Sequence, residues 1–191
     1  MKKMKSLEDI IGLEVVSSDA KLIGELDGIG IDINTWTAPV VRFCLKKGMD
    51  GPLGVKKPLF GAACLLIESS YIERVSDVIT LTRTMGEIRS LLIERAQVPL
   101  MAGEMVGKRV VGKNGREIGV VETIVIDTDK GWAVPQIKVR LDKYVVEELN
   151  LKKTILSTPL IGISTKDIRT VGDLVMLSIA TDQLKGMLEK S

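Results

Sequence analysis

The chain has 191 residues, 45% of them hydrophobic and 27% charged, and a formal net charge of +2. It contains no histidine, which excludes the commonest general acid–base, the nucleophilic dyads that depend on imidazole and most transition-metal sites. Basic and acidic residues nearly balance and six residues are aromatic, a composition unlike that of a nucleic-acid-binding surface. We therefore expect a protein that is not an enzyme, holds no cofactor or metal, and makes no direct contact with nucleic acid.

The first residues, MKKMKS, are basic, but no apolar segment follows them. We therefore expect no signal peptide. The longest nearly apolar run, residues 58–67, is too short to span a bilayer. These two features predict a cytoplasmic protein without membrane insertion.

A long strand is predicted in the first part of the chain, within the segment SSDAKLIGELDGIGID. Gly28 and Gly30 fall inside it, and isolated glycines in strands mark bends or bulges. A half-buried strand follows at residues 41–46, where apolar and more polar side chains alternate. The pattern therefore predicts a bent strand that pairs with a second one.

The two cysteines of the chain are Cys44 and Cys64, and both lie in apolar, strand-like runs. Buried free cysteine behaves as a small hydrophobic residue, and disulfides are rare in the cytoplasm. We interpret this pair as free thiols rather than as a disulfide.

Two tryptophans occupy predicted loops where a large aromatic side chain is partly exposed. Trp36 follows Asn34 and Thr35, and Trp132 follows Lys130 and Gly131. Exposed tryptophan is a common anchor of protein interfaces. Each tryptophan is therefore a candidate partner-binding residue, and the alternative is that it caps the end of its own set of strands.

The segment GMDGPLGVKKPLF, residues 48–60, places apolar residues between turn formers. We take four of them as candidate partner-binding residues: Leu53, Val55, Leu59 and Phe60. The corresponding segment of the second half, KYVVEELNLKKTIL, has a different sequence. The divergence indicates either different partners for the two halves or drift in a loop.

Reverse turns are predicted at VSDVITL and VGDLVML, where a small residue precedes an aspartate. The aspartates are Asp77 and Asp173, and the small residue of the second turn is Gly172. We assign both carboxylates a structural role, in hydrogen bonds to nearby backbone amides.

Each half of the chain ends in a predicted helix. In TMGEIRSLLIERA, residues 84–96, Thr84 and Glu87 form a capping-box pattern ahead of apolar residues at helical spacing. VPLMAG then breaks the helix, and TDQLKGMLEK near the C-terminus has Thr181 as its expected cap. The apolar stripes pack on their own strands or, alternatively, bind a partner.

The glycine-rich stretch GKNGREIGVVETIVID, residues 112–127, raises the question of a phosphate-binding loop. Such a loop needs a Lys-Ser or Lys-Thr pair after its second glycine and a helix behind it, and neither is present. Asn114 and Gly115 instead form a two-residue hairpin signal between runs of valine and isoleucine. We predict strand, turn, strand.

The chain repeats itself at an offset of 95 to 96 residues. The matched pairs include Val15/Val110, Gly24/Gly119, Asp32/Asp127, Trp36/Trp132, Pro39/Pro135, Leu53/Leu149, Asp77/Asp173 and Leu81/Leu177. Matches at so constant an offset indicate a tandem duplication, with one domain at residues 1–98 and a second at 99–191.

IGLEVVSSDAKLIGELDGIGID and VGKRVVGKNGREIGVVETIVID resemble the opening of the PRC-barrel domain. YIERVSDVITL and IRTVGDLVML resemble its closing segment. This family is named for the cytoplasmic barrel of the photosynthetic reaction-centre H subunit. The resemblance implies a mainly β protein with two tandem, small antiparallel barrels, each followed by a short C-terminal α-helix. One departure is Ser76, where glycine is usual, which predicts some backbone strain at that turn.

The resemblance also implies a function, that of a non-enzymatic adaptor between proteins. Archaeal PRC-barrel proteins are linked to FtsZ-based cell division, so the implied partners are SepF or other PRC-barrel division proteins. We expect a homodimer that a partner recruits to the membrane-associated division site. The alternatives are a ribosome-assembly factor like RimM, which binds a ribosomal protein, and an assembly factor for a membrane complex.

Overall fold

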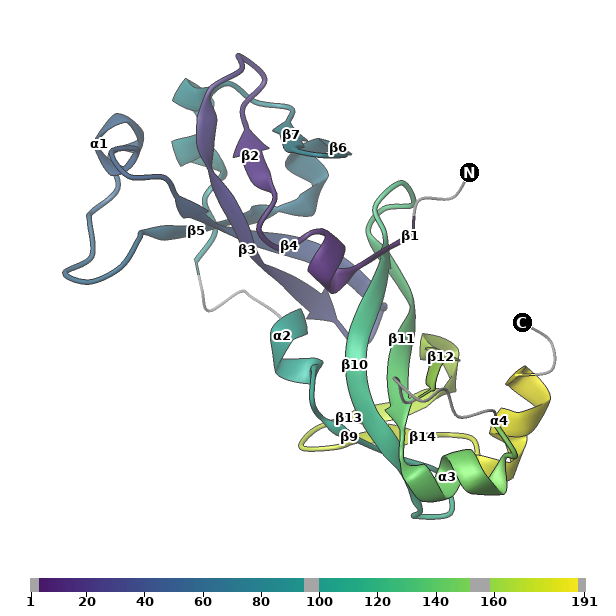
Figure 1. The fold of residues 1–191 in the computed structure, drawn as a ribbon. Coiled ribbons are helices and arrows are strands. Elements are labelled where there is room, and N and C mark those ends of the chain that lie inside the picture. Colours follow the sequence, from purple (N-terminus) through teal and green to yellow (C-terminus); the bar gives the residue numbers. More distant parts are fainter. Residues whose placement is uncertain (1–3, 95–99, 152–158, 189–191) are drawn as a thin grey trace. The chain divides into compact units, whose positions relative to one another are not determined.

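The computed structural model describes residues 4–94, 100–151 and 159–188 and is mainly β (Figure 1). The chain forms two compact units. The first unit comprises Met1–Gly103 together with Ile126–Ala133, and the second comprises Glu104–Val125 together with Val134–Ser191. Among the described residues, the helices are all too short or too polar to cross a membrane.

The first unit is built on a curled, open sheet with the strand order β5-β4-β3-β2-β7-β6. Neighbouring strands are antiparallel, except that β2 and β7 are parallel. The strands are β2 (Glu14–Val16), β3 (Leu22–Asp32), β4 (Thr37–Leu45), β5 (Cys64–Glu68), β6 (Ile72–Val75) and β7 (Ile79–Leu81). Short elements complete it: β1 (Met4–Ser6), η1 (Leu7–Asp9), α1 (Asp50–Leu53), η2 (Ser69–Tyr71), η3 (Met85–Leu91) and β8 (Leu100–Met101), which pairs with β3.

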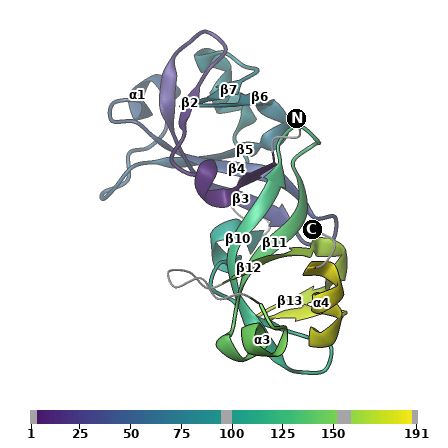
Figure 2. The same ribbon diagram turned by 45° about the vertical axis from the view of Figure 1, so that its right-hand side comes forward.

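The second unit repeats this topology strand for strand, in the order β12-β11-β10-β9-β14-β13. Its strands are β9 (Arg109–Val111), β10 (Glu117–Asp127), β11 (Ala133–Leu141), β12 (Leu160–Ser164), β13 (Ile168–Val171) and β14 (Val175–Leu177). Its helices are α3 (Lys143–Glu148), η5 (Thr165–Asp167) and α4 (Thr181–Leu188), and α2 (Ala102–Met105) precedes β9. Figure 2 shows α3 and α4 flanking this sheet. The repeated sequence is therefore matched by a repeated strand order.

The expected bend in the long strand β3 is confirmed. The pairing register with β4 shifts between Leu26 and Gly28, and again between Gly30 and Asp32. Register shifts of this kind increase the local twist and re-aim the strand. The alternating side chains of β3 and β4 form the core of the unit, in which Ile29 and Val41 are almost fully buried.

The helix expected after residue 84 is a 3-10 helix, η3, and not an α-helix. Its capping box is present, because Glu87 accepts hydrogen bonds from the Thr84 amide at 2.9 Å and hydroxyl at 2.7 Å. These bonds, the backbone one first, lower the pKa of the Glu87 carboxyl. Beyond Leu91 the chain is extended, and the Ile93 amide donates to the Leu66 carbonyl on β5. The chain after Leu91 bonds to the exposed edge of β5, and the helix therefore ends before residue 96. Residues 95 and 96 of the predicted helix lie outside the described residues.

The C-terminal helix α4 begins at Thr181, which was expected to be its cap. Neighbouring residues make a hydrogen bond at this helix end instead: the Ala180 amide donates to the Gln183 side chain at 2.9 Å. The Thr181 hydroxyl is buried without a hydrogen-bond partner in the described structure. Leu184 is buried, as expected for the apolar stripe, whereas the Met187 and Leu188 side chains lie outside the described residues.

The predicted hairpin at Asn114–Gly115 is confirmed, because β9 and β10 are antiparallel on either side of it. Gly115 adopts a left-handed φ of +78° and its amide donates to the Gly112 carbonyl. The same turn in the first unit has Ala20 at this position, with φ +59° and the amide bonded to the Ser17 carbonyl. A side chain in this conformation is strained, whereas glycine is not.

Exchanging the residues at this turn position is expected to have opposite effects in the two units. Ala20→Gly should raise the free energy of unfolding by about 0.5 kcal/mol, because relief of strain exceeds the added entropy of the unfolded chain. Gly115→Ala should lower it by about 1 kcal/mol. Urea unfolding followed by circular dichroism measures both. A loss of stability in Ala20→Gly would contradict the strain argument.

The expectation of free thiols is wrong. Cys44 lies directly opposite Cys64 in the β4–β5 pairing, and the two form a disulfide with a Cα–Cα distance of 3.9 Å. Both side chains point to the more exposed face of the strand pair, since their neighbours Phe43 and Leu65 are the buried ones. Alternation along the strands therefore places the cysteines outside the core, where direct cross-strand neighbours are close enough to bond.

Candidate interaction site

The segment between β4 and β5 carries the most exposed apolar side chains of the described structure. Leu59 is 96% exposed and Phe60 is 92% exposed. The two residues are adjacent in this loop, shortly before β5 begins at Cys64, and we call them the apolar tip. Single exposed apolar residues are ordinary, but adjacent large ones mark interaction surfaces.

The other two candidate residues of this segment have different surroundings. Leu53 is the last residue of α1 and is 3% exposed, so it belongs to the core of the first unit. Val55 is half-buried, and its amide donates to the carbonyl of Asp50, the first residue of α1. The short helix thus turns Leu53 inward and leaves the apolar tip as the exposed part of the loop.

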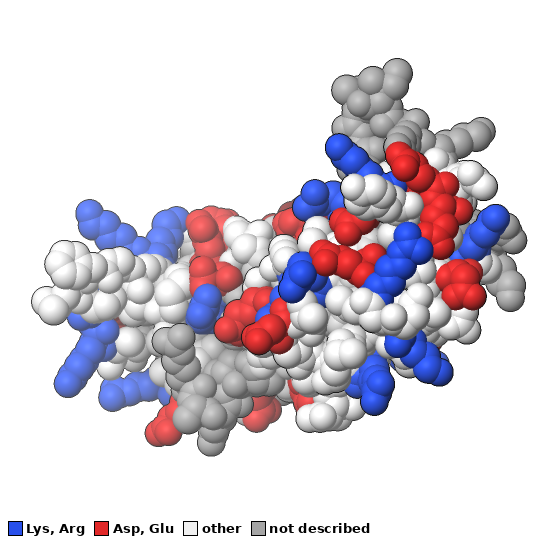
Figure 3. Space-filling model, turned by 90° about the horizontal axis from the view of Figure 1, so that it is seen from below, with Lys and Arg blue, Asp and Glu red and all other residues white. Residues whose placement is uncertain are grey.

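The loop that carries the apolar tip is basic. The segment 46–63 contains four lysines and one aspartate, for a net charge of +3, whereas the whole chain carries +2. The remainder of the chain is therefore at −1. Figure 3 shows basic side chains (Lys and Arg) projecting beside an uncharged surface at its left end. All four are exposed: Lys46, Lys47, Lys56 and Lys57.

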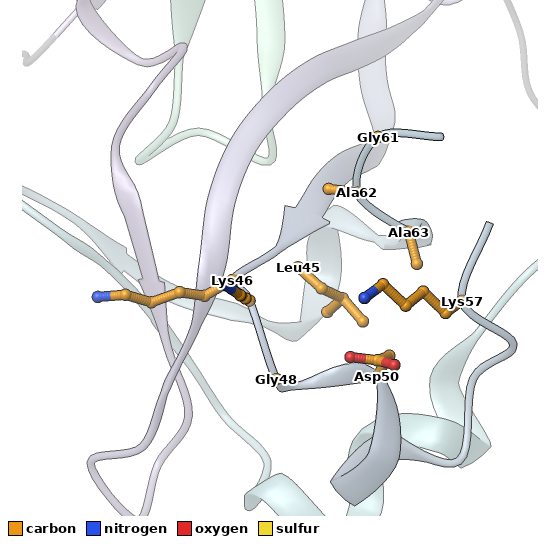
Figure 4. Close-up of a pocket in the computed structure, with 9 residues that line it drawn as sticks. Leu45, Lys46, Gly48, Asp50, Lys57, Gly61, Ala62 and Ala63 are labelled. Atoms are coloured by element: carbon orange, nitrogen blue, oxygen red, sulfur yellow. The ribbon is translucent and has the colours of Figure 1, made fainter. Parts of the chain in front are cut away.

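A hollow of about 260 Å³ lies beside the loop, between the end of β4 and the start of β5. Figure 4 shows the Lys57 side chain reaching into it, with its ammonium group next to Leu45 and above Asp50. Lys46 also borders the hollow but points away from it. The opposite wall is made of the small residues Ala62 and Ala63. The hollow thus combines an inward-facing cation with a narrow apolar wall.

The base of this loop is fixed in two ways. The β4–β5 pairing runs in register from Val40 opposite Glu68 to Cys44 opposite Cys64, and the disulfide joins the last pair covalently. The second unit has Arg140 and Leu160 at the equivalent register position. The covalent closure of the loop is therefore a property of the first unit.

Asp27 lies within reach of the two sulfur atoms, and the three side chains form the one cluster of possible metal ligands among the described residues. The sulfurs are joined in a disulfide and so are not thiolate ligands. The Asp27 carboxylate is held by Arg42, whose Nε donates to it at 2.6 Å. This arrangement makes the cluster a structural element of the β3–β5 face.

The two tryptophans occupy equivalent positions at the tips of the β3–β4 and β10–β11 hairpins. Both have a left-handed backbone, with φ of 51° at Trp36 and 58° at Trp132. Trp36 is half-buried, whereas Trp132 is 5% exposed. Of the two, Trp36 offers surface to a partner, and neither lies in the loop that carries the apolar tip.

The predicted reverse turns lie between β6 and β7 and between β13 and β14, with Asp77 and Asp173 exposed at their ends. They are closed by backbone bonds, since the Ser76 amide donates to the Val78 carbonyl and the Gly172 amide to the Leu174 carbonyl. Among the described residues no donor bonds to either aspartate carboxylate. The strain expected at Ser76 is also absent, because its φ is not left-handed.

A different aspartate makes the bonds expected of a structural carboxylate. Asp19, in the β2–β3 turn, accepts hydrogen bonds from the Ser17 hydroxyl at 2.6 Å and the Met85 amide at 2.9 Å. These bonds, that from Ser17 first, lower the pKa of Asp19. The carboxylate ties this turn to the start of η3.

Comparison of the sequence with protein-family models finds no match, and comparison with curated proteins also finds none. Among solved structures, the chain matches that of a protein provisionally described as the 16S ribosomal RNA processing protein RimM of Pseudomonas aeruginosa. The match has 11% sequence identity and a TM-score of 0.29, and it covers 84% of this chain and 98% of the other. At this TM-score the two structures superpose too poorly for the match to bear on function.

Proposed function

We propose that the protein is a non-enzymatic adaptor that docks onto another protein through the apolar tip, Leu59 and Phe60. The observation that carries the proposal is the nearly complete exposure of two adjacent large apolar side chains on a loop with a fixed base. Burying such a side chain contributes about 1.5–3 kcal/mol. A loop whose base is already fixed also loses less conformational entropy when it binds. Trp36, on the β3–β4 hairpin, is a second candidate contact.

The finer assignment follows the sequence resemblance. We propose that the two sheets are PRC-type barrels and that the protein acts in the archaeal FtsZ and SepF cell-division machinery. Its partners are then SepF or other PRC-barrel proteins, and it works as a cytoplasmic homodimer that a partner recruits to the division site. The matching strand order of the two units supports a duplicated module. Two linked modules raise avidity or bridge two partners.

The test is affinity capture of the tagged full-length protein from cells of its source, with mild cross-linking and with or without nuclease. Wild type is compared with the double variant Leu59→Ser/Phe60→Ser. The matched control is Tyr144→Ser, because Tyr144 is also a large exposed residue, 78% exposed on α3. Circular dichroism establishes that all three chains fold.

We expect wild type and Tyr144→Ser to recover FtsZ, SepF or other PRC-barrel proteins whether or not nuclease is present. The tip variant should recover at least about tenfold less, the loss that corresponds to 1.4 kcal/mol of binding energy. Equal recovery by the tip variant would contradict docking through Leu59 and Phe60. Nuclease-sensitive recovery of small-subunit ribosomal proteins would instead support the alternative, a ribosome-assembly factor like RimM.

A further inference from the structure

We propose that the segment bound at the apolar tip is acidic: a stretch of polypeptide that presents apolar side chains between Asp and Glu residues and places one carboxylate at Lys57. This inference rests on the proposed docking function of the tip and specifies the chemistry of its partner. Three features of the loop carry it: its charge, its shape and its composition.

The charge of the loop is unusual for this chain. Its four lysines concentrate +3 in residues 46–63, while the rest of the chain is at −1. None of the four forms an ion pair with any described residue, although exposed arginines such as Arg116 and Arg140 do. Their charges are therefore available to a partner. Complementary charge of this kind speeds association and selects among partners.

The shape of the loop favours a polypeptide over a lipid surface. Lys57 faces into the hollow (Figure 4), whereas Leu59 and Phe60 are almost fully exposed. A bilayer surface is flat on this scale and would not fill a hollow of about 260 Å³. A single Asp or Glu side chain can enter it, with its stem against Ala62 and Ala63 and its carboxylate at the Lys57 ammonium. Such a charge-assisted bond is roughly twice as strong as a neutral one.

The composition of the loop argues against nucleic acid. Sequence-tolerant binding of single strands uses several aromatic side chains on which successive bases stack, whereas Phe60 is the sole aromatic residue in the segment 46–63. A backbone phosphodiester and a carboxylate each carry one negative charge, so it is the presence of a single aromatic residue that sets the loop apart from a site for single-stranded nucleic acid.

The experiment measures binding of four short synthetic peptides of equal length to the full-length chain by fluorescence anisotropy. The peptides vary charge and apolar content separately. One contains Glu, Leu and Phe, one contains Gln, Leu and Phe, one contains Glu and Ser, and one contains Lys, Leu and Phe. Binding is measured at about 50 mM and about 500 mM sodium chloride, where charges are screened over very different lengths. Phosphatidylserine-containing vesicles and a single-stranded RNA serve as the competing probes.

We expect the Glu–Leu–Phe peptide to bind at least about tenfold more tightly than each of the other three at low salt, and the advantage to shrink at high salt. Lys56→Gln/Lys57→Gln should remove most of this advantage. Lys113→Gln/Lys143→Gln is the matched control, because both lysines are exposed on the second unit, and it should leave binding unchanged. Leu59→Ser/Phe60→Ser should weaken the Glu–Leu–Phe and Gln–Leu–Phe peptides alike.

Equal binding of the Glu, Gln and Lys peptides would overturn the inference, as would tighter binding to the vesicles or the RNA than to any peptide. The inference can fail while the docking function stands. In that case the tip variant still loses its partners on capture, but the lysine variant does not. If neither variant changes capture, the docking function itself is wrong.

Discussion

Replacing Gly24 with alanine is expected to lower the free energy of unfolding by about 3 kcal/mol, an effect at the upper end for overpacking by one methyl group. A Cβ at this position would lie 2.0 Å from the carbonyl oxygen of Cys44 on the paired strand β4. Because the obstructing atom is backbone, relief requires β3 and β4 to separate. Gly119 stands in the same position in the second unit, with its Cβ site 2.0 Å from the Arg140 carbonyl, so Gly119→Ala should cost a similar amount.

Urea unfolding followed by circular dichroism tests this pair of variants. Gly86→Ala is the control, because a Cβ there meets no atom within 4 Å and its φ is not left-handed. It should raise the free energy of unfolding by about 0.4–1 kcal/mol, because alanine restricts the unfolded chain and fits the native conformation here. If Gly24→Ala or Gly119→Ala lowered the free energy of unfolding by less than about 0.5 kcal/mol, the strands would have adjusted without cost. That result would contradict the close packing.

Reduction of the Cys44–Cys64 disulfide is expected to lower the free energy of unfolding of the first unit by about 3 kcal/mol. The bond joins residues 20 apart, and closing a loop of that length restricts the unfolded chain by about this amount. For a unit of this size, the melting temperature should fall by roughly 12–24 °C. Thermal unfolding with and without dithiothreitol measures the difference.

The double variant Cys44→Ser/Cys64→Ser separates the covalent bond from other effects of the reductant. Its melting temperature should match that of the reduced wild type and should not respond to dithiothreitol. If oxidised and reduced wild type melt together, the disulfide contributes nothing to stability, and the β4–β5 pairing alone holds the base of the loop.

Local signals predicted much of the fold. The hairpin at Asn114–Gly115, the bulges near Gly28 and Gly30 and the Thr84–Glu87 capping box are set by residues close together in the chain, so they are readable from sequence. The disulfide was missed because register decides it. Two cysteines on facing strands bond only when they are opposite one another, and strand register depends on contacts distant in sequence.

The end of η3 also depends on a contact distant in sequence. Periodicity predicted a helix through residue 96, but the Ile93 amide bonds to the Leu66 carbonyl at the sheet edge. No pattern within residues 84–96 reveals that competing partner. Tertiary structure overrides local helix propensity here.

The candidate site was predicted in part. Apolar residues among turn formers indicated that the segment 48–60 is a candidate partner-binding site. The sequence did not distinguish the buried Leu53 from the exposed Leu59 and Phe60. A four-residue helix decides the difference, because α1 turns Leu53 into the core. The basic charge of the loop was missed, although its signal is visible as two Lys-Lys pairs near the ends of the segment. In a chain of nearly neutral charge, local charge carries information that the total hides.

The closed base of the loop also affects how readily the loop tolerates substitutions and insertions. Strand pairing and a covalent bond both hold residues 44 and 64 together, and longer loops add little to the entropy of closure. Apart from Leu45 and Leu53, which are buried in the core, the residues between them can therefore be exchanged, lengthened or grafted from another sequence while the sheet beneath is preserved. The sheet and the binding specificity of the first unit are in this sense separable. The loop is therefore the place to engineer a new binding specificity.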